Sequence, residues 1–158
     1  IGWVATDLKQ IKRMSRVVTN VSHSHLEAIK GTEAIASCIY LARTKHSKDE
    51  IRSYIENSYY PMNFTIQKIR KTYSYNVSCQ GSVPQAIECF LESTDFEDAL
   101  RNAISLGGDS DTIGAMTGCI AEAYYEIPSW MIDKAKEYLP DELIQVEEKF
   151  YTYLKLKQ

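Results

Sequence analysis

The sequence predicts an all-α protein, and three observations support that prediction. Apolar residues recur at spacings of three and four, as on one face of a helix, for example Ile51, Tyr54 and Ile55. No run shows the apolar–polar alternation and β-branched enrichment of a strand. Pairs of Ser or Thr with Glu or Gln three residues later mark helix starts. We therefore expect helices over residues 7–19, 25–43, 48–59, 64–71, 83–91, 95–106, 112–125, 129–139 and 141–154.

Four helix starts are placed by capping pairs, in which a hydroxyl and a carboxylate or amide satisfy free N–H groups of the first turn. The pairs are Ser24 with Glu27, Ser47 with Glu50, Ser82 with Gln85, and Thr94 with Glu97. Pro84 is compatible with a helix that begins at Val83, because the first turn needs no N–H donor there. Gly107-Gly108 ends the helix over 95–106, because glycine accepts the left-handed backbone of a C-terminal cap.

Composition and charge exclude several functional classes. Of the 158 residues, 44% are hydrophobic and 25% charged, which are the proportions of a globular domain rather than a disordered chain. The net charge of -3 and the absence of a dense Lys/Arg run argue against nucleic-acid binding. No apolar stretch reaches the roughly 20 residues of a membrane span. The four cysteines form no C-x-x-C pair, so we expect a reduced, cytoplasmic protein without a zinc ribbon or thioredoxin motif.

The segment between the helices over 95–106 and 112–125 carries the residues most suited to chemistry. Asp109 and Asp111 stand two apart in an expected loop, and Thr112 adds a hydroxyl oxygen. Hard cations such as Mg²⁺ and Mn²⁺ prefer oxygen ligands of this kind. Gly107 and Gly108 remove side-chain bulk, so that backbone and ligand can approach closely.

The helix that follows this loop is expected to run through the middle of the fold. Gly114 and Gly118 lie inside it, although a glycine in a helix costs about 1 kcal/mol relative to alanine. Two such residues make sense if one face of the helix packs closely against a neighbouring helix. The helix would then hold the aspartate loop rigidly.

The two aspartates also occur in three other kinds of motif. Aspartate is favoured at a helix N-terminus, so capping of the next helix stays open as an alternative on the residues alone. An EF-hand starting at Asp109 is excluded, because Ile113 and Ile120 occupy the fifth and twelfth positions, where oxygen ligands are needed. An aspartate-nucleophile phosphatase is excluded as well, because a helix and two glycines precede the aspartates instead of a buried strand.

Three segments, in order, resemble the ADP-ribosylglycohydrolase family. The most specific is Gly107-Gly108-Asp109-Ser110-Asp111-Thr112-Ile113-Gly114, continuing to Ile127-Pro128. The second is residues 78–87, Ser-Cys-Gln-Gly-Ser-Val-Pro-Gln-Ala-Ile. The third is residues 22–27, Ser-His-Ser-His-Leu-Glu, which is similar to the family's Thr-His-x-His-Pro-Glu with Ser22 and Leu26 as replacements. Together with Ile1-Gly2-Trp3, the resemblance covers almost the whole chain.

The resemblance implies a fold, a metal centre and an activity. The fold is an all-α orthogonal multi-helix bundle, of which residues 1–158 would form the C-terminal part of a single domain. Two divalent cations, Mg²⁺ or Mn²⁺, would be held in part by Asp109, Asp111 and Thr112, and Asp111 would bridge both ions. His23, Gly107, Gly108 and Ser110 would bind substrate, and His25 is interpreted as structural.

The implied enzyme is a hydrolase that removes ADP-ribose from modified protein side chains or small conjugates by cleaving N- or O-glycosidic bonds. Asp109 and Asp111 would be its catalytic residues, and its only expected partner is the ADP-ribose moiety, with no nucleic acid and no membrane. The family's remaining ligands come from a Thr-Asp-Asp motif, which this sequence lacks. The alternative is therefore a catalytically inactive protein of the same fold that binds ADP-ribose or serves a structural role.

Overall fold

The all-α prediction is confirmed by a computed structural model, which describes residues 1–156. Within these residues the chain forms nine helices and no strand. They are α1 (Leu8–Thr19), α2 (Leu26–Arg43), α3 (Lys48–Ser58), α4 (Ile66–Ile69), α5 (Cys79–Leu91), α6 (Phe96–Leu106), α7 (Ser110–Tyr124), α8 (Ser129–Lys136) and α9 (Asp141–Lys155). Most boundaries fall within two residues of those that the sequence predicts.

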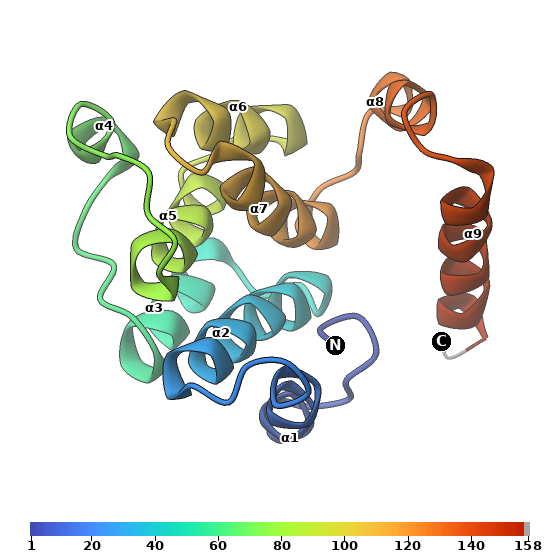
Figure 1. The fold of residues 1–158 in the computed structure, drawn as a ribbon, viewed down its shortest axis with the longest axis horizontal. Coiled ribbons are helices and arrows are strands. Elements are labelled where there is room, and N and C mark those ends of the chain that lie inside the picture. Colours follow the sequence, from blue (N-terminus) through green and yellow to red (C-terminus); the bar gives the residue numbers. More distant parts are fainter. Residues whose placement is uncertain (157–158) are drawn as a thin grey trace. The chain divides into compact units, whose positions relative to one another are not determined.

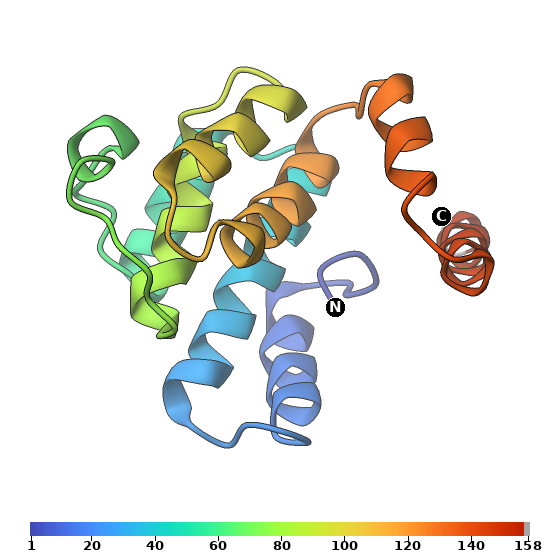
Figure 2. The same cartoon turned by 45° about the horizontal axis from the view of Figure 1, so that its top comes forward.

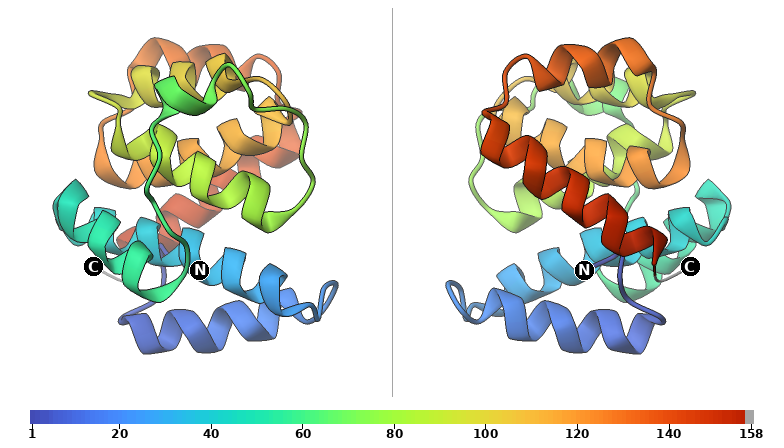
Figure 3. Two further views of the ribbon diagram at one scale, coloured as in Figure 1. Left: turned by 90° about the vertical axis from the view of Figure 1, so that its left-hand side faces the viewer. Right: turned by 90° about the vertical axis from the view of Figure 1, so that its right-hand side faces the viewer.

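The chain forms two compact units, Ile1–Glu126 and Ile127–Gln158. In the first unit, α7 contacts α2, α5 and α6, and Figures 1 and 2 show it between α6 and α2. Helix α1 packs alongside α2 (Figure 3). The predicted position of the α7 helix in the middle of the fold is therefore confirmed. That the whole chain belongs to a single domain stays a prediction.

Helix α7 is buried on most of its surface and open along one stripe. Ile113, Thr117 and Ile120 have no exposed surface, and the Thr117 hydroxyl donates a hydrogen bond to the Ala86 carbonyl of α5 at 3.0 Å. The stripe formed by Asp111, Thr112, Ala115 and Cys119 is exposed in the first unit. The helix thus carries the N-terminal aspartates on a rigid support, with one face accessible.

The two glycines inside α7 differ in how closely they pack. A Cβ added at Gly118 would lie 3.3 Å from Leu100 Cδ2 of α6, whereas one at Gly114 would lie 3.8 Å from Ile104 Cδ1. The first distance is tight and the second is ordinary van der Waals contact. Close packing therefore accounts for Gly118, but the prediction that it also requires glycine at position 114 is wrong.

Of the four predicted capping pairs, only Ser47 with Glu50 forms. Ser47 Oγ accepts from the Glu50 N–H at 3.3 Å, and Glu50 Oε2 accepts from the Ser47 N–H at 2.7 Å. Helix α2 is capped instead by His25, whose Nδ1 accepts from the Glu27 N–H at 3.2 Å. Helix α6 is capped by Asp95, which is a stronger cap than the predicted threonine before it.

Helix α5 begins at Cys79, earlier than the predicted start at Val83. Its cap is Ser78, whose Oγ accepts from the Gly81 N–H at 3.1 Å, while Ser82 lies inside the helix and donates to the Ser78 carbonyl at 2.9 Å. Pro84 therefore also lies inside the helix. A proline there removes one N–H from the helical ladder.

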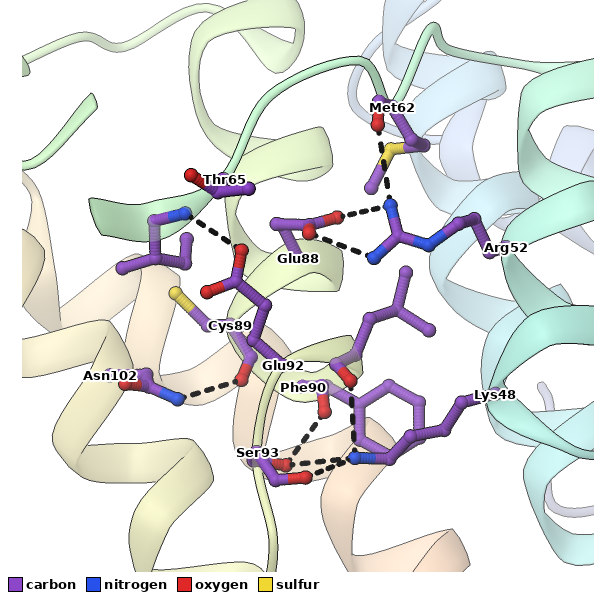
Figure 4. Close-up of polar contacts among 12 residues, drawn as sticks. Lys48, Arg52, Met62, Thr65, Glu88, Cys89, Phe90, Glu92, Ser93 and Asn102 are labelled. Atoms are coloured by element: carbon purple, nitrogen blue, oxygen red, sulfur yellow. Dashed lines mark hydrogen bonds and ion pairs between the residues drawn. The ribbon is translucent and has the colours of Figure 1, made fainter. Parts of the chain in front are cut away.

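The connection between α3 and α5, residues 59–78, is called the strap below. Polar contacts from both helices fix its first part (Figure 4). Arg52 donates to the Met62 carbonyl at 3.3 Å and makes two bonds of 2.9 and 2.8 Å to the Glu88 carboxylate. Glu92 Oε1 accepts from the Ile66 N–H at 2.9 Å, so the start of α4 is tied to the end of α5.

The second unit consists of α8 and α9, neither of which has a buried residue. Lys136 and Glu147 form an ion pair of 3.9 Å between them. Across the described part of the chain, no helix combines the length and hydropathy of a membrane span.

Candidate functional site

The turn between α6 and α7 depends on its two glycines. Gly107 has φ 74° and ψ -154°, a region of backbone conformation that glycine occupies almost alone. Gly108 follows with φ 66°. The prediction that these glycines supply a backbone with positive φ at the end of α6 is confirmed. The turn leads directly into Asp109, the residue that immediately precedes α7.

The sequence predicted Asp111 in the loop between α6 and α7. This prediction is wrong, because α7 already begins at Ser110. Ser110 and Asp111 lie in the first helical turn, and Thr112 follows on the same exposed end of the helix. Asp109 occupies the N-cap position, but its side chain makes no capping hydrogen bond. Capping by Asp109 therefore does not explain why the second carboxylate is present.

The two carboxyl groups lie close enough to interact. Hydrogen bonding by the backbone N–H of Thr112, followed by the interaction with the Asp109 carboxyl, holds the pKa of Asp111 below its usual value. Among residues 1–156, neither aspartate forms an ion pair with a basic side chain. The result is a concentrated negative charge at the exposed start of α7, in reach of the Thr112 hydroxyl.

Tyr73 of the strap lies directly behind this turn. A Cβ added at Gly108 would lie 2.8 Å from Tyr73 Cε1 and 3.2 Å from the Ser74 carbonyl group, so the turn passes against both residues. Burial, with a smaller contribution from the charge of Asp109, raises the pKa of Tyr73. Its hydroxyl donates to the Gly81 carbonyl of α5 at 2.7 Å.

His23 lies in the exposed loop between α1 and α2, with Nδ1 2.8 Å from the Ser22 hydroxyl oxygen. His25 caps α2 and has a local structural role. His25 thus has the structural role expected from the sequence, and substrate binding by His23 stays a prediction.

A pocket of about 640 Å³ brings His23 and Thr112 to one concave surface. It lies among α1, α2, α5 and α7, and its lining is mainly apolar, including Val18, Ile35 and Val83. Asp109 and Asp111 do not line this pocket, so only part of the predicted set of site residues is gathered there.

The donor set suits a hard cation. Asp109, Asp111 and Thr112 offer two carboxylates and a hydroxyl at one exposed helix end, and hard cations take such oxygen ligands together with water. Within residues 1–156, no group of three or more His, Cys, Asp or Glu side chains could hold a metal ion. A cation held at this helix end would therefore need ligands beyond Asp109, Asp111 and Thr112.

Sequence reasoning did not assign several residues that shape this region. Cys79, Ser82 and Val83 line the pocket with Gly31 and Thr32. Tyr73, which contacts the glycine turn, is not assigned from the sequence either. Residues 22–27 and 78–87, which carry the family resemblance, border the pocket, and this resemblance was the sequence signal for its lining. The contact between Tyr73 and the glycine turn has no such signal, because a contact between distant residues leaves no periodic pattern in the sequence.

Comparison with known proteins gives a consistent assignment. The sequence model of the ADP-ribosylglycohydrolase family matches residues 1–158. An uncharacterized protein of Archaeoglobus fulgidus is 27% identical over 152 residues, which cover 85% of this chain and 50% of that protein. Human ADP-ribosylhydrolase ARH3 is 44% identical over 64 residues, which cover 31% of this chain and 18% of the human protein.

A solved structure shares the fold. The ADP-ribosylglycohydrolase-related protein complex superimposes with a TM-score of 0.55 at 26% sequence identity, covering 75% of this chain and 42% of that one. This likeness confirms the predicted type of helical bundle. The matched residues cover half or less of the length of each of these three proteins.

Proposed function

This chain belongs to the ADP-ribosylglycohydrolase family, and we propose that it carries part of a metal-dependent site that hydrolyses ADP-ribosyl N- or O-glycosidic bonds. The observation that supports the proposal is the arrangement at the start of α7. Asp109 and Asp111 interact there without a basic partner among the described residues, and Thr112 extends from the same helix end into a pocket that also holds His23.

In the proposed site, Asp109, Asp111 and Thr112 would hold two divalent cations, Mg²⁺ or Mn²⁺. Such a pair of ions orients ribose hydroxyls and lowers the pKa of bound water when it is present. The depressed pKa of Asp111 keeps its carboxyl ionised, which suits a ligand shared by two cations. The Gly107–Gly108 turn fixes the direction from which both carboxylates approach.

The remaining residues are proposed to bind the ADP-ribosyl group. Gly107, Gly108 and Ser110 lie beside Asp109 at the start of α7, and we place the diphosphate against them, where bound cations would offset the charges of the two aspartates. His23 faces the same pocket as Thr112 and can hydrogen-bond a ribose or phosphate oxygen. The apolar lining between them suits the flat, weakly polar face of a nucleobase.

The reaction is a hydrolysis at the anomeric carbon. A water oxygen forms a bond to that carbon while the bond to an arginine nitrogen or a serine oxygen breaks, through an oxocarbenium-like transition state. The proton lost by the water is balanced by the proton that the leaving nitrogen or oxygen gains. Asp109 and Asp111 would contribute by holding the cations that position the ribosyl group and the attacking water.

The proposal is tested by release of ADP-ribose from peptides modified on arginine or serine, with Mg²⁺, with Mn²⁺ and with EDTA. We expect release by the complete protein that carries this chain, and loss of release with EDTA. Binding of ADP-ribose without any release would favour the inactive, ADP-ribose-binding alternative. Full activity in EDTA would contradict the metal proposal alone.

A further inference from the structure

Hydrogen bonds hold the strap between α3 and α5 near its start and again at Tyr73, which lies in its last part. Arg52 and Glu92 hold the start of the strap through Met62 and Ile66 (Figure 4). The Tyr73 N–H donates to the Ile69 carbonyl at 2.8 Å. Its position is therefore set by α4 as well as by the helices that flank the strap.

The Tyr73 side chain joins three elements. Its hydroxyl donates to the Gly81 carbonyl in the first turns of α5 at 2.7 Å. Its ring packs against a buried cluster that includes Leu106 at the end of α6 and Ile113 at the start of α7. A half-buried ring held on both sides in this way has little freedom to rotate.

The edge of this ring is the surface against which the Gly107–Gly108 turn rests. Tyr73 Cε1 lies so close to Gly108 that even a methyl group at that position would be only 2.8 Å away. Asp109 is the next residue, and its charge is near enough to act on the Tyr73 phenol. A displacement of the ring would leave a space behind the turn, and the turn could then shift together with both aspartates.

We propose that Tyr73 is a positioning residue, whose ring supports Gly108 and so fixes the direction of the Asp109 and Asp111 carboxylates. This inference rests on the proposed metal site and adds to it the contact between Tyr73 and Gly108 that keeps its ligands in place. The ring, rather than the hydroxyl, makes the contact with Gly108. Phenylalanine should therefore replace Tyr73 without loss of the support, whereas leucine should not.

The experiment compares Tyr73→Leu and Tyr73→Phe with Tyr75→Leu. Tyr75 is the matched control, because it lies in the same strap, two residues further on, and is 68% exposed. The first readout is the set of backbone ¹⁵N order parameters of Gly108, Asp109 and Asp111 in this chain without metal. The second is the Mn²⁺ dissociation constant, measured by electron paramagnetic resonance at a temperature where circular dichroism shows every variant folded.

In the wild type and in Tyr73→Phe, we expect order parameters near about 0.85 for the turn, and in Tyr73→Leu values below about 0.6. Tyr73→Leu should also weaken Mn²⁺ binding by about 10–100-fold, the usual effect of losing a residue that orients a metal ligand. Tyr75→Leu should change neither readout.

A rigid turn in Tyr73→Leu, or equal effects of Tyr73→Leu and Tyr75→Leu, would overturn the role of Tyr73. The order parameters need no metal, so they decide that role even if the wild-type chain binds no Mn²⁺. Failure of the complete wild-type protein to bind Mn²⁺ would instead count against the proposed metal site. The two failures are therefore distinguishable.

Discussion

Among single residues, Asp111 and Asp109 have unequal surroundings. The backbone N–H of Thr112 lowers the pKa of the Asp111 carboxyl, whereas the Asp109 side chain makes no capping bond. Asp111 is also the proposed bridging ligand. Its negative charge would therefore be shared by two cations, and Asp109 would serve one.

We expect Asp111→Asn to nearly abolish ADP-ribose release by the complete protein, because an amide offers two cations one weak neutral ligand. Loss of an outer partner of a metal site costs about 10–100-fold, and loss of the bridging ligand should cost more. Asp109→Asn should reduce release less than Asp111→Asn does. Initial rates with modified arginine and serine peptides measure both effects, and an Asp111→Asn protein with wild-type rates would refute the metal assignment.

For whole helices, the structure predicts different outcomes for the same substitution at two positions of α7. Alanine in place of a helical glycine gains about 1 kcal/mol in the absence of steric conflict. Gly114 has room for the methyl group at 3.8 Å from Ile104, whereas Gly118 has 3.3 Å to Leu100. Urea unfolding should show that Gly114→Ala raises the free energy of unfolding by about 0.5–1 kcal/mol. Gly118→Ala should gain clearly less or lose stability, and equal gains would contradict the close packing of α6 and α7.

The start of α3 gives a pH-dependent prediction. Hydrogen bonds from the Ser47 backbone and side chain lower the pKa of Glu50 below its ordinary value of 4.5. A depressed pKa in the folded state contributes stability above the ordinary value, and this stability is lost as the pH falls through the lowered pKa. Removal of the Ser47 hydroxyl should cost about 0.5–2 kcal/mol at pH 7. Unfolding of Ser47→Ala and wild type at pH 7 and pH 3 should give a smaller difference at pH 3, and a larger one there would contradict the coupling.

The sequence allowed the helices to be predicted better than the contacts between them. Periodicity placed each helix, because burial of one face decides where a helix forms. Individual caps were harder to predict. Ser78 caps α5 instead of Ser82, and Asp95 caps α6 instead of Thr94, because several polar residues near a helix start can each serve as the cap. Part of the site followed from residues 107–112, but the support by Tyr73 could not, because it joins residues far apart in the sequence.

For the molecule as a whole, the length of this chain relative to its relatives affects the activity that we expect of it. It spans 50% of the archaeal relative, and its described residues supply two carboxylates and one hydroxyl to the proposed metal site. We expect the 158-residue chain alone to bind Mn²⁺ weakly and to release ADP-ribose at close to the background rate. A protein extended to the length of that relative should be active. Rapid turnover by the isolated chain would show that the described ligands are sufficient.

The exposed stripe of α7 also equips the protein with its own reporter group. Cys119 lies on this stripe and is exposed, whereas Cys38 and Cys89 are buried. Burial raises the pKa of all four thiols, that of Cys89 to about 12, so access to the dye rather than thiolate content distinguishes Cys119. A maleimide dye should therefore label Cys119 first without any engineered cysteine. Any segment that covers the open face of α7 will slow this labelling, so the rate of dye attachment reveals directly whether α7 is shielded in a longer protein.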